Sequence, residues 1–587
     1  MRLAAAALLV ALAVLATFFE VREFEFVNRD DDINVYENPH LHPITADTFA
    51  QVWTAPYVGL YIPVSYSVWA ALAWGSREDS AAGSVSPLDP GVFHTANLAL
   101  HALASVLVLF LLFRITGRLP ASTVGAFLFA LHPLQVETVA WVTELRGLLS
   151  ACLSLLAMGA YVSYCADPVH RRRTWLAGLG CFALALLSKP SAVAVPLMLL
   201  ALDGFALRRD WRAALRSTSA WFGLAALAAL GARTLQTADT IEFVAPLWAR
   251  PMIAGDAFAH YLQKLVWPTE LAMDYGRTPE VAMESAGFFF LWLLPLALML
   301  VVFAARRARS ARAPLALFTA GLLPVLGLIP FSYQDISTVA DRYVYLAMLG
   351  PALGVAALVG HLRGRGVWLA AIVVLSLLGW KSRAQTRTWR TTETVASHAI
   401  GVSPGSWGLH VNLGSYYSAE GRLEEARASY REALRLHPEA VQALFNLAAI
   451  ASRSGQLDEA RGFLERAVEI EPGFAEAHAS LGLTAMQMGD IERAEQALEA
   501  AENLAVDRAE VHQSLGVLCA RLKDLDRAHE HLTEAVRLRP GYIEARFNLA
   551  YTAEQMGRKE EARKQYERIL ELRADFEAAR AGLQRLE

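Results

Sequence analysis

The sequence predicts an all-α protein with two parts, a polytopic helical membrane domain and a following α-solenoid of short helical repeats. Three observations lead to this fold class. The 587 residues are 55% hydrophobic and only 19% charged, with a mean hydropathy of +0.31, which is unusually apolar for a soluble chain of this length. The charged residues are concentrated in the last third of the chain. That last third also repeats with a fixed period of 34 residues.

Residues 1–385 form the predicted membrane domain, because they contain many segments close to the roughly 20 apolar residues that a transmembrane helix needs. We expect eleven spans, at about 3–19, 96–113, 120–135, 147–165, 174–189, 190–206, 218–236, 286–304, 313–331, 343–361 and 367–381. The first is expected to be uncleaved, since no small-x-small cleavage site follows it. Segment 56–75 is short of a clean span and is expected to be a partly embedded connecting helix.

The distribution of arginine predicts the orientation of these spans. If the N-terminus lies inside, the inside connections carry fifteen arginines, which agrees with the positive-inside rule. They are Arg114, Arg118, Arg171, Arg172, Arg173, Arg208, Arg209, Arg212, Arg216, Arg306, Arg307, Arg309, Arg312, Arg363 and Arg365. An odd number of spans then places the repeats outside, in the periplasm or a lumen.

The first outer loop contains three consecutive aspartates, Asp30, Asp31 and Asp32, in the stretch FVNRDDDINVYENPHL. Other ionisable residues fall at the same predicted face: His132, Glu137, Glu144, Arg146, Lys189, Arg233, Lys264, Asp341 and Arg342. Ionisable groups at an otherwise apolar membrane face are functional candidates. Carboxylates and cations together suit a site that activates an acceptor and binds an anionic leaving group.

The four cysteines, Cys152, Cys165, Cys181 and Cys519, show no paired or metal-type spacing and are interpreted as small buried hydrophobic residues. No bound metal or cofactor is therefore expected. The net charge of −4 gives no sign of nucleic-acid binding.

The repeats are visible in two columns of residues. Leu413, Leu447, Leu481, Leu515 and Leu549 are 34 residues apart, and so are Ala426, Ala460, Ala494, Ala528 and Ala562. This period, with small residues at the eighth and twentieth places, is typical of tetratricopeptide repeats. We expect a linker helix at 386–404 and five repeats at 405–587, which stack into a solenoid with a concave groove.

Three polar residues of the repeats are candidate acceptor-binding residues. Asn446, Asn548 and His512 fall in the first helices of their repeats, which line the concave face in this architecture. An asparagine amide can hydrogen-bond an extended peptide backbone without requiring a particular sequence. The same positions are also compatible with merely solvated helix residues.

An acidic first outer loop joined to tetratricopeptide repeats resembles the transmembrane-and-tetratricopeptide-repeat (TMTC) protein O-mannosyltransferases and their bacterial relatives, which have the C-type glycosyltransferase fold. The stretches that carry the resemblance are FVNRDDDINVYENPHL, HPLQVETVAWVTELRGLLS, LLSKPSAVAVPLMLL, YLQKLVWPTELAMDY and DRYVYL. They cover the membrane half at intervals. A bacterial relative would lie in the inner membrane, with its repeats in the periplasm.

The resemblance implies a polyprenyl-phosphate sugar donor, a protein acceptor and an aspartate of the first outer loop as catalytic base. The family's acidic pair maps best on Asp30 and Asp31, before Asn38, and the third aspartate allows a shift by one. We expect Asp31 to be the base. The expected donor-phosphate residues are Arg342, Lys189, Arg146 and Lys264, and the expected supporting residues are His132, Glu137, Asn38 and Asp341.

The sequence departs from the family after Glu137. Relatives usually have an arginine followed two places later by an acidic residue, whereas Leu145 and Gly147 stand here, with Arg146 displaced by one. Two other functions remain open: a non-catalytic scaffold whose repeats assemble an envelope complex, and a lipid-carrier flippase or polymerase-like protein. Convergence of Asp30–Asp32, Lys189 and Arg342 on one outer cavity would discriminate among these functions, because a scaffold has no reason to arrange it.

Overall fold

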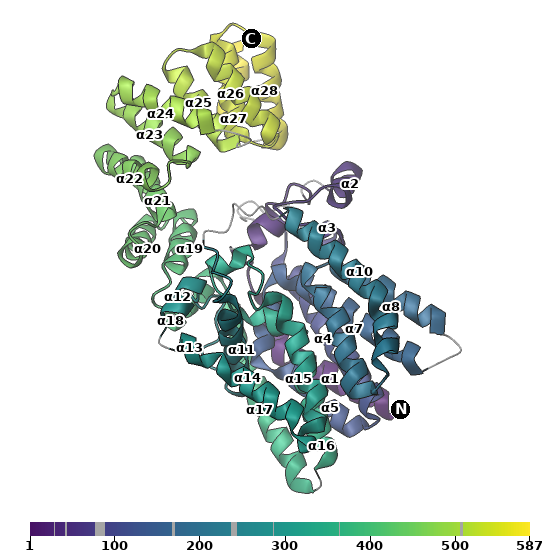
Figure 1. The fold of residues 1–587 in the computed structure, drawn as a ribbon. Coiled ribbons are helices and arrows are strands. Elements are labelled where there is room, and N and C mark those ends of the chain that lie inside the picture. The colour runs from purple at the N-terminus through teal and green to yellow at the C-terminus, as the bar shows by residue number, and fades with distance from the viewer. Residues whose placement is uncertain are drawn as a thin grey trace. The chain divides into compact units, whose positions relative to one another are not determined.

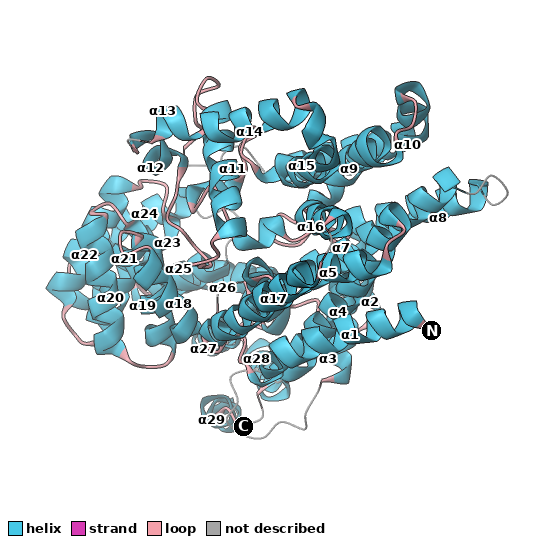
Figure 2. Ribbon diagram, turned by 90° about the horizontal axis from the view of Figure 1, so that it is seen from below, coloured by secondary structure: helices cyan, strands magenta, loops and turns pink. Residues whose placement is uncertain are grey.

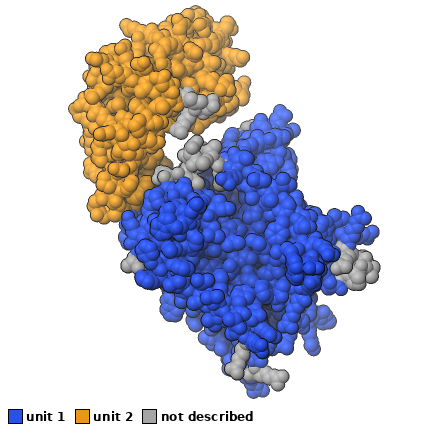
Figure 3. Space-filling model, in the orientation of Figure 1, with its two compact units in different colours: residues 1–406 blue, residues 407–587 orange. Residues whose placement is uncertain are grey.

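The computed structural model describes residues 1–587 except 29, 42–43, 77–87, 167–170, 236–242, 286, 363, 505–508, 574 and 587, and it leaves out the side chains of residues 171 and 307. Arg363 and the side chains of Arg171 and Arg307, which support the predicted orientation, thus lie outside the described part. The described residues are mainly helical and contain no β-strand, which confirms the all-α class (Figures 1 and 2). The chain divides into two compact units, residues 1–406 and residues 407–587 (Figure 3).

The first unit is the membrane domain. Its α-helices are α1 (Arg2–Phe18), α2 (Ala46–Thr54), α3 (Pro63–Gly75), α4 (Pro90–Thr116), α5 (Leu119–Leu131), α6 (Val136–Ala140), α7 (Leu145–Ala166), α8 (Arg171–Leu186), α9 (Val195–Ala201), α10 (Trp211–Leu235), α11 (Arg250–Val266), α12 (Pro279–Glu284), α13 (Phe288–Leu291), α14 (Leu293–Ala304), α15 (Arg309–Leu322), α16 (Leu349–His361), α17 (Arg365–Thr386) and α18 (Thr392–Val402). Short helical turns join them, among them η2 (Asp32–Tyr36), η3 (Pro133–Gln135), η4 (Val142–Glu144), η5 (Pro190–Ala194) and η11 (Asp341–Val344).

Six helical stretches of the described chain are long and apolar enough to cross a membrane: Arg2–Glu23, Pro90–Thr116, Val142–Ala166, Pro190–Leu207, Trp211–Leu235 and Arg365–Trp389. A seventh is a pair bent by 53°, Leu119–Leu131 with Pro133–Ala140. The other four expected spans correspond to shorter helices, α8, α13 with α14, α15 and α16. A polytopic helical domain is thus confirmed, while the number of eleven spans stays a prediction.

The bend in the seventh stretch follows from proline. Pro133 has no backbone N–H to continue α5, so the helix ends at Leu131 and restarts as η3 and α6. Freed backbone groups at such a break must be satisfied by protein. Gln135 does this for the carbonyl of Phe129, to which its Nε2 donates at 3.1 Å. At the next turn, beyond α6, Asn97 of α4 donates from Nδ2 to the carbonyl of Trp141 at 2.7 Å and to that of Val139 at 3.4 Å.

The acidic loop is held by an apolar cluster. Val35 and Leu41 of the loop pack with Tyr66 and Trp69 of α3, and Val142 of η4 belongs to the same buried cluster. Part of segment 56–75 is therefore a helix, as expected, and its buried face supports the loop. Burial of these side chains removes apolar surface from water, which fixes the loop against η4.

The end of the first unit returns to the same loop. The backbone N–H of Glu25 donates to the carbonyl of Arg390 at 3.1 Å, and the N–H of Asn28 donates to Oγ1 of Thr392 at 2.9 Å. Thr392 opens α18, the helix that precedes the repeats. The backbone before the aspartates is thus tied to residues beyond the last long apolar helix.

The second unit is a solenoid of five helix pairs and a final helix. The helices are α19 (Trp407–Ala419), α20 (Leu423–Leu436), α21 (Val441–Arg453), α22 (Leu457–Ile470), α23 (Ala475–Met488), α24 (Ile491–Leu504), α25 (Ala509–Arg521), α26 (Leu525–Leu538), α27 (Ile543–Gln555), α28 (Lys559–Leu572) and α29 (Glu577–Leu586). The alanines of the twentieth place are fully buried. A Cβ at Gly516 would lie 2.5 Å from Leu532, so a small residue at the eighth place lets paired helices approach. The predicted repeats are confirmed.

Candidate functional site

The three aspartates of the acidic loop occupy different environments. Asp31 is fully buried, and its carboxylate accepts three hydrogen bonds. Oδ1 accepts from the backbone N–H of Thr143 at 2.9 Å and from its hydroxyl at 2.6 Å, and Oδ2 accepts from the N–H of Val27 at 2.9 Å. Asp31 therefore fastens the loop to η4.

Burial dominates the electrostatics of Asp31. It raises the pKa of this carboxyl from its ordinary value of 3.8 to about 7, although the three donors from Thr143 and Val27 oppose the shift. Burial also raises the pKa of Asp32, which begins the turn η2. Both groups are more easily protonated than an ordinary carboxyl.

Asp30, unlike Asp31, is partly exposed and lies beside a cation. Its side chain is 38% exposed, and Oδ2 lies 3.6 Å from a terminal guanidinium nitrogen of Arg146. Its backbone carbonyl accepts from the N–H and the side-chain amide of Asn34, both at 2.9 Å, which orients this part of the loop. A carboxylate that is partly exposed and beside a cation can reach a substrate hydroxyl.

Asp30 belongs to a larger group, here called the charged cluster. Its members are Asp30, Glu137, Glu144, Arg146, Lys189 and Arg342. They come from the acidic loop, α6, η4, the first turn of α7, the residue before η5, and η11. Three carboxylates and three cations thus meet from segments far apart in the sequence.

Glu144 lies at the centre of the charged cluster. Its buried carboxylate accepts from Nζ of Lys189 at 2.7 and 2.9 Å, and Oε1 lies 3.8 Å from Nε of Arg146 and 3.9 Å from Nε of Arg342. A buried carboxylate with three cations around it is stabilised in its ionised form. Glu144 therefore holds three cations in one place.

Arg342 is held most tightly of the three cations. Glu137 accepts from its guanidinium at 2.5 Å and from its backbone N–H at 2.9 Å. The guanidinium carbon also lies 4.2 Å from the ring centre of Tyr333 and 5.3 Å from that of Trp141. Contacts with aromatic faces add cation–π attraction and fix the plane of the guanidinium.

Arg146 and Lys189 lie on the more open side of the charged cluster. Their side chains are 15% and 16% exposed, against 7% for Arg342 and none for Glu144. Within the described part of the chain, the buried Nε of Arg146 has no hydrogen-bond partner. An unsatisfied donor in a half-buried cation is available to an anionic ligand.

Gly147 permits the close approach of Glu144 and Lys189. A Cβ at this position would lie 2.3 Å from Oε2 of Glu144 and 3.2 Å from Nζ of Lys189. Gly147 stands where the resembling TMTC family usually has an acidic residue, and the contact between Glu144 and Lys189 leaves room only for a small residue here. The acidic partner of Arg146 comes from two places before it, in Glu144, rather than from two places after it.

Lys264, Asp341, His132 and Asn38 make other contacts. Nζ of Lys264 donates to the carbonyls of Thr269 and Glu270, and Asp341 accepts from the hydroxyl of Tyr275 at 2.8 Å. The other two residues bond to backbone groups. His132 contacts the backbone of Leu134 and Leu265, and Asn38 that of Asn34 and His40. Their hydrogen bonds in the described part of the chain thus go to residues outside the charged cluster.

Sequence reasoning missed one residue of this arrangement, Thr143, which is not a candidate at all. Glu144 is named among the ionisable candidates at this face, but without a role of its own. A signal for Glu144 existed, because it is an acidic residue two places before Arg146 in an apolar stretch. Nothing in the sequence marks Thr143 as the partner of Asp31, since 112 residues separate them.

The three candidate acceptor residues lie on the first helices of their repeats, as expected. Asn446 is on α21, His512 on α25 and Asn548 on α27, and all are half-buried. Nδ2 of Asn446 lies 3.5 Å from Oγ of Ser415, and Nδ1 of His512 lies 3.1 Å from Nδ1 of His531. His512 is thus engaged within its own repeat.

Comparisons with known proteins agree with both parts of the chain. Tetratricopeptide repeat models match residues 411–473, and residues 453–518 and 520–586. The chain is 23% identical over 417 residues to the human "Protein O-mannosyl-transferase TMTC1", a match that covers 61% of this chain and 47% of that protein. It is 30% identical over 118 residues to the Drosophila melanogaster "Protein O-mannosyl-transferase Tmtc2", covering 18% of this chain and 12% of that one.

The human match covers more of the chain than the repeat unit contains, so it includes part of the membrane domain. The chain spans about half the length of this relative or less. Among solved structures, it is similar to "YrrB: a TPR protein with an unusual peptide-binding site" (21% identity, 32% of this chain, 97% of that one, TM-score 0.25). It is also similar to TTC0263, a tetratricopeptide-repeat protein of Thermus thermophilus (25% identity, 31% and 98%, TM-score 0.28).

Proposed function

Because the chain is similar to the TMTC protein O-mannosyl-transferases in its membrane domain and carries tetratricopeptide repeats, we propose that it is a membrane glycosyltransferase. In this proposal it moves a sugar, mannose by analogy with the relatives' names, from a polyprenyl-phosphate donor to a protein hydroxyl. The reaction takes place at the outer membrane face, and the repeats present the acceptor.

The charged cluster is the observation that carries this proposal. A transfer from a lipid-linked phosphate needs a carboxylate for the acceptor proton and fixed cations for the leaving phosphate, at one depth in the membrane. Asp30, Arg146 and Lys189 supply both kinds of group on the open side of the cluster. A scaffold would not require a carboxylate of intermediate exposure beside two half-buried cations.

We assign the role of base to Asp30 rather than to Asp31. Asp31 is fully buried and its oxygens are engaged by Val27 and Thr143, so it serves as a positioning residue for the loop. Asp30 is partly exposed, and its Oδ2 lies 3.6 Å from a guanidinium nitrogen of Arg146. In this assignment Asp31 orients the loop that carries Asp30, the base.

The proposed step is a single displacement. The acceptor oxygen forms a bond to the anomeric carbon while Asp30 takes its proton. The bond from that carbon to the phosphate oxygen breaks, and its electron pair leaves with the phosphate. Arg146 and Lys189 stabilise the charge that develops on this oxygen, and Glu144 and Arg342 keep the two cations in place.

A transfer assay with purified protein tests this assignment. Polyprenyl-phosphate mannose and a hydroxyl-bearing peptide are the substrates, and other polyprenyl-phosphate sugars are run beside them. Asp30→Asn should lower turnover by about 100- to 10,000-fold, the usual contribution of a general base, with donor binding largely retained. Asp47→Asn, at an exposed acid of α2, is the matched control and should keep normal turnover. Near-normal turnover of Asp30→Asn would exclude Asp30 as the base.

A further inference from the structure

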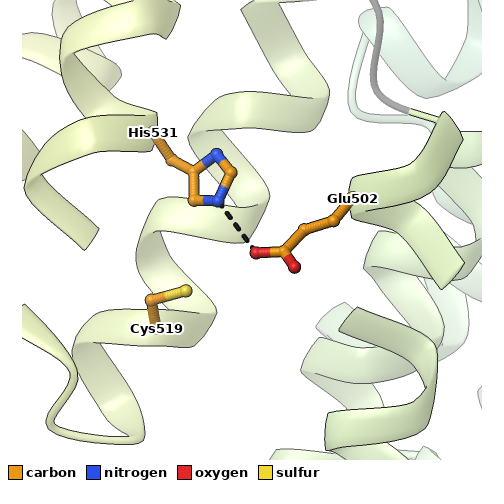
Figure 4. A group of neighbouring side chains, drawn as sticks. All are labelled: Glu502, Cys519 and His531. Atoms are coloured by element: carbon orange, nitrogen blue, oxygen red, sulfur yellow. Dashed lines mark hydrogen bonds and ion pairs between the residues drawn. The ribbon is translucent and has the colours of Figure 1, made fainter. Parts of the chain in front are cut away.

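Three potential metal ligands face one another in the solenoid. Glu502 lies on α24, Cys519 on α25 and His531 on α26, and their side chains point into a common space (Figure 4). Nε2 of His531 lies 3.0 Å from Oε1 of Glu502. One ligand atom from each of the three residues lies within 4.8 Å of the other two.

The types of atom and their spacing suit zinc. A thiolate, an imidazole nitrogen and a carboxylate oxygen are its usual protein ligands. Ligand atoms around a tetrahedral zinc ion lie about 3.3–3.8 Å apart, from bond lengths of about 2.0–2.3 Å. Small side-chain movements would therefore bring Glu502, Cys519 and His531 onto one ion. The three come from consecutive helices, which explains why the spacing of the cysteines gives no metal signal.

We propose that Glu502, Cys519 and His531 bind a divalent transition-metal ion, zinc by preference, which links the third and fourth repeats. The chain supplies three ligands and leaves a fourth position for water or for a group of a bound partner. This site is separate from the charged cluster and does not depend on the proposed transferase activity.

His512 completes the arrangement as a positioning residue. Its Nδ1 lies 3.1 Å from Nδ1 of His531, and the two rings are stacked at 5.4 Å. For Nε2 of His531 to bind a metal, its Nδ1 must carry the proton, and His512 can accept the hydrogen bond from it. A second residue that fixes the tautomer of a ligating histidine is a regular feature of metal sites.

Arg527 and the thiol proton of Cys519 compete with a metal ion for its ligands, and both can be displaced. Arg527 forms an ion pair with Glu502, but its side chain is 45% exposed and can turn into solvent. Burial raises the pKa of the Cys519 thiol to about 11, so without a cation it is protonated. Metal binding displaces this proton to solvent, and the affinity should therefore rise with pH.

The experiment titrates the full-length protein in detergent with Zn²⁺ and, in parallel, with Co²⁺. We expect one ion per chain and, in the Co²⁺ form, a thiolate-to-metal charge-transfer absorption. Cys519→Ser and Cys519→Val should both abolish this absorption and lower affinity at least 100-fold. The valine variant keeps the apolar core, so it separates loss of a ligand from loss of folding, which circular dichroism checks.

His529 provides the matched control for His531. It lies on the same helix and contacts Glu561 at 2.7 Å, and it is not part of the group of three ligands. His531→Gln should weaken Zn²⁺ binding at least 100-fold, whereas His529→Gln should leave it unchanged. His512→Ala should weaken binding about 10- to 100-fold, and His512→Gln, which keeps a hydrogen-bond acceptor, should weaken it less.

Three results would overturn the proposal. They are the absence of stoichiometric Zn²⁺ binding to folded protein, Co²⁺ binding without thiolate absorption, and equal losses in His529→Gln and His531→Gln. Equal losses in the two histidine variants would mean that the metal binds non-specifically to surface side chains and not to Glu502, Cys519 and His531.

Discussion

Asp31 holds a loop in place with a carboxyl that prefers to be neutral. The ionised form is disfavoured by burial, and the pKa in the folded protein is about 7 rather than 3.8. The protonated carboxyl of Asp31 therefore contributes stability to the folded loop. This free-energy contribution is fully present below about pH 4 and is lost as the pH rises through 7.

We therefore expect hydrogen exchange to report weaker protection of the Val27 and Thr143 amides as the pH rises from 5 to 8. After correction for the intrinsic pH dependence of exchange, protection should fall by up to about tenfold per pH unit. Asp31→Asn should remove the dependence, because the group no longer titrates. A decline of the same size in the variant would place the titrating group elsewhere.

Gly147 gives a second prediction for single residues. Gly147→Ala should reduce donor use, because the new Cβ would meet the carboxylate of Glu144 at 2.3 Å and separate it from Lys189. Gly159→Ala is the control. Gly159 lies on the same helix, and a Cβ added there would have no described atom within 4 Å beyond the backbone of its own helix. This variant should be neutral or stabilising by up to about 1 kcal/mol. Steady-state kinetics with the donor varied distinguishes the two. Equal donor saturation in both variants would contradict the role of the close approach.

The sequence is informative about which residues belong to the site and less so about their contacts. Arg146, Lys189 and Arg342 stand out as charges in apolar surroundings, and the structure brings them together. The sequence cannot show that Asp31 is buried while Asp30 is partly exposed, because the three neighbouring residues are all aspartates. The difference arises from packing against Thr143, which depends on the fold as a whole.

At the scale of elements, the break between α5 and α6 and the turn after α6 place two acids of the site. Glu137 follows this break in α6, and Glu144 ends η4 after a second turn, at the end of α6. Asn97 holds the second turn by donating to the carbonyls of Val139 and Trp141.

Asn97→Ala should lower stability by about 1–3 kcal/mol, because it removes two buried hydrogen bonds and leaves the carbonyl of Trp141 with the N–H of Glu144 alone. It should also lower transfer activity, although Asn97 is not part of the charged cluster. Thr95→Ala, on the exposed side of the same helix, is the control and should change neither. Thermal unfolding in detergent and the transfer assay measure the two effects. Stability of Asn97→Ala equal to that of the control would show that the turn holds without this side chain.

Helices α17 and α16 show where local hydropathy places the start of a helix correctly and where it does not. Helix α17 begins two residues from its expected start, since its apolar run is continuous. Helix α16 begins at Leu349, six residues later than expected, because residues 341–344 form the turn η11 that directs Arg342 to Glu137. Local hydropathy cannot show that a charged pair, rather than a span, shapes this segment. The repeats were predicted best, because their period is written into the sequence itself.

For the whole molecule, all residues proposed for chemistry lie in the first unit. Removing residues 407–587 should abolish transfer to the natural protein acceptor, while donor hydrolysis or transfer to a short peptide continues. Both are measured on truncated protein shown to be folded. If the shortened chain modifies its natural acceptor as well as the full chain does, presentation by the repeats is wrong.

Two hydrogen bonds join residues 25–28 to residues 390–392, which lie beyond the last long apolar helix. The end of the apolar helices is therefore not the end of the segment that supports the proposed site. A chain trimmed after residue 385, where the apolar helices end, would lose the carbonyl of Arg390 and the hydroxyl of Thr392, and with them two anchors of the backbone just before Asp30. A chain trimmed after residue 406 keeps both. We expect donor hydrolysis to persist in the longer fragment and to fall sharply in the shorter one. Equal hydrolysis by the two would mean that these hydrogen bonds are dispensable. If hydrolysis falls only in the shorter fragment, residues 386–406 support the backbone before Asp30, and substitutions at Arg390 or Thr392 should also lower donor hydrolysis.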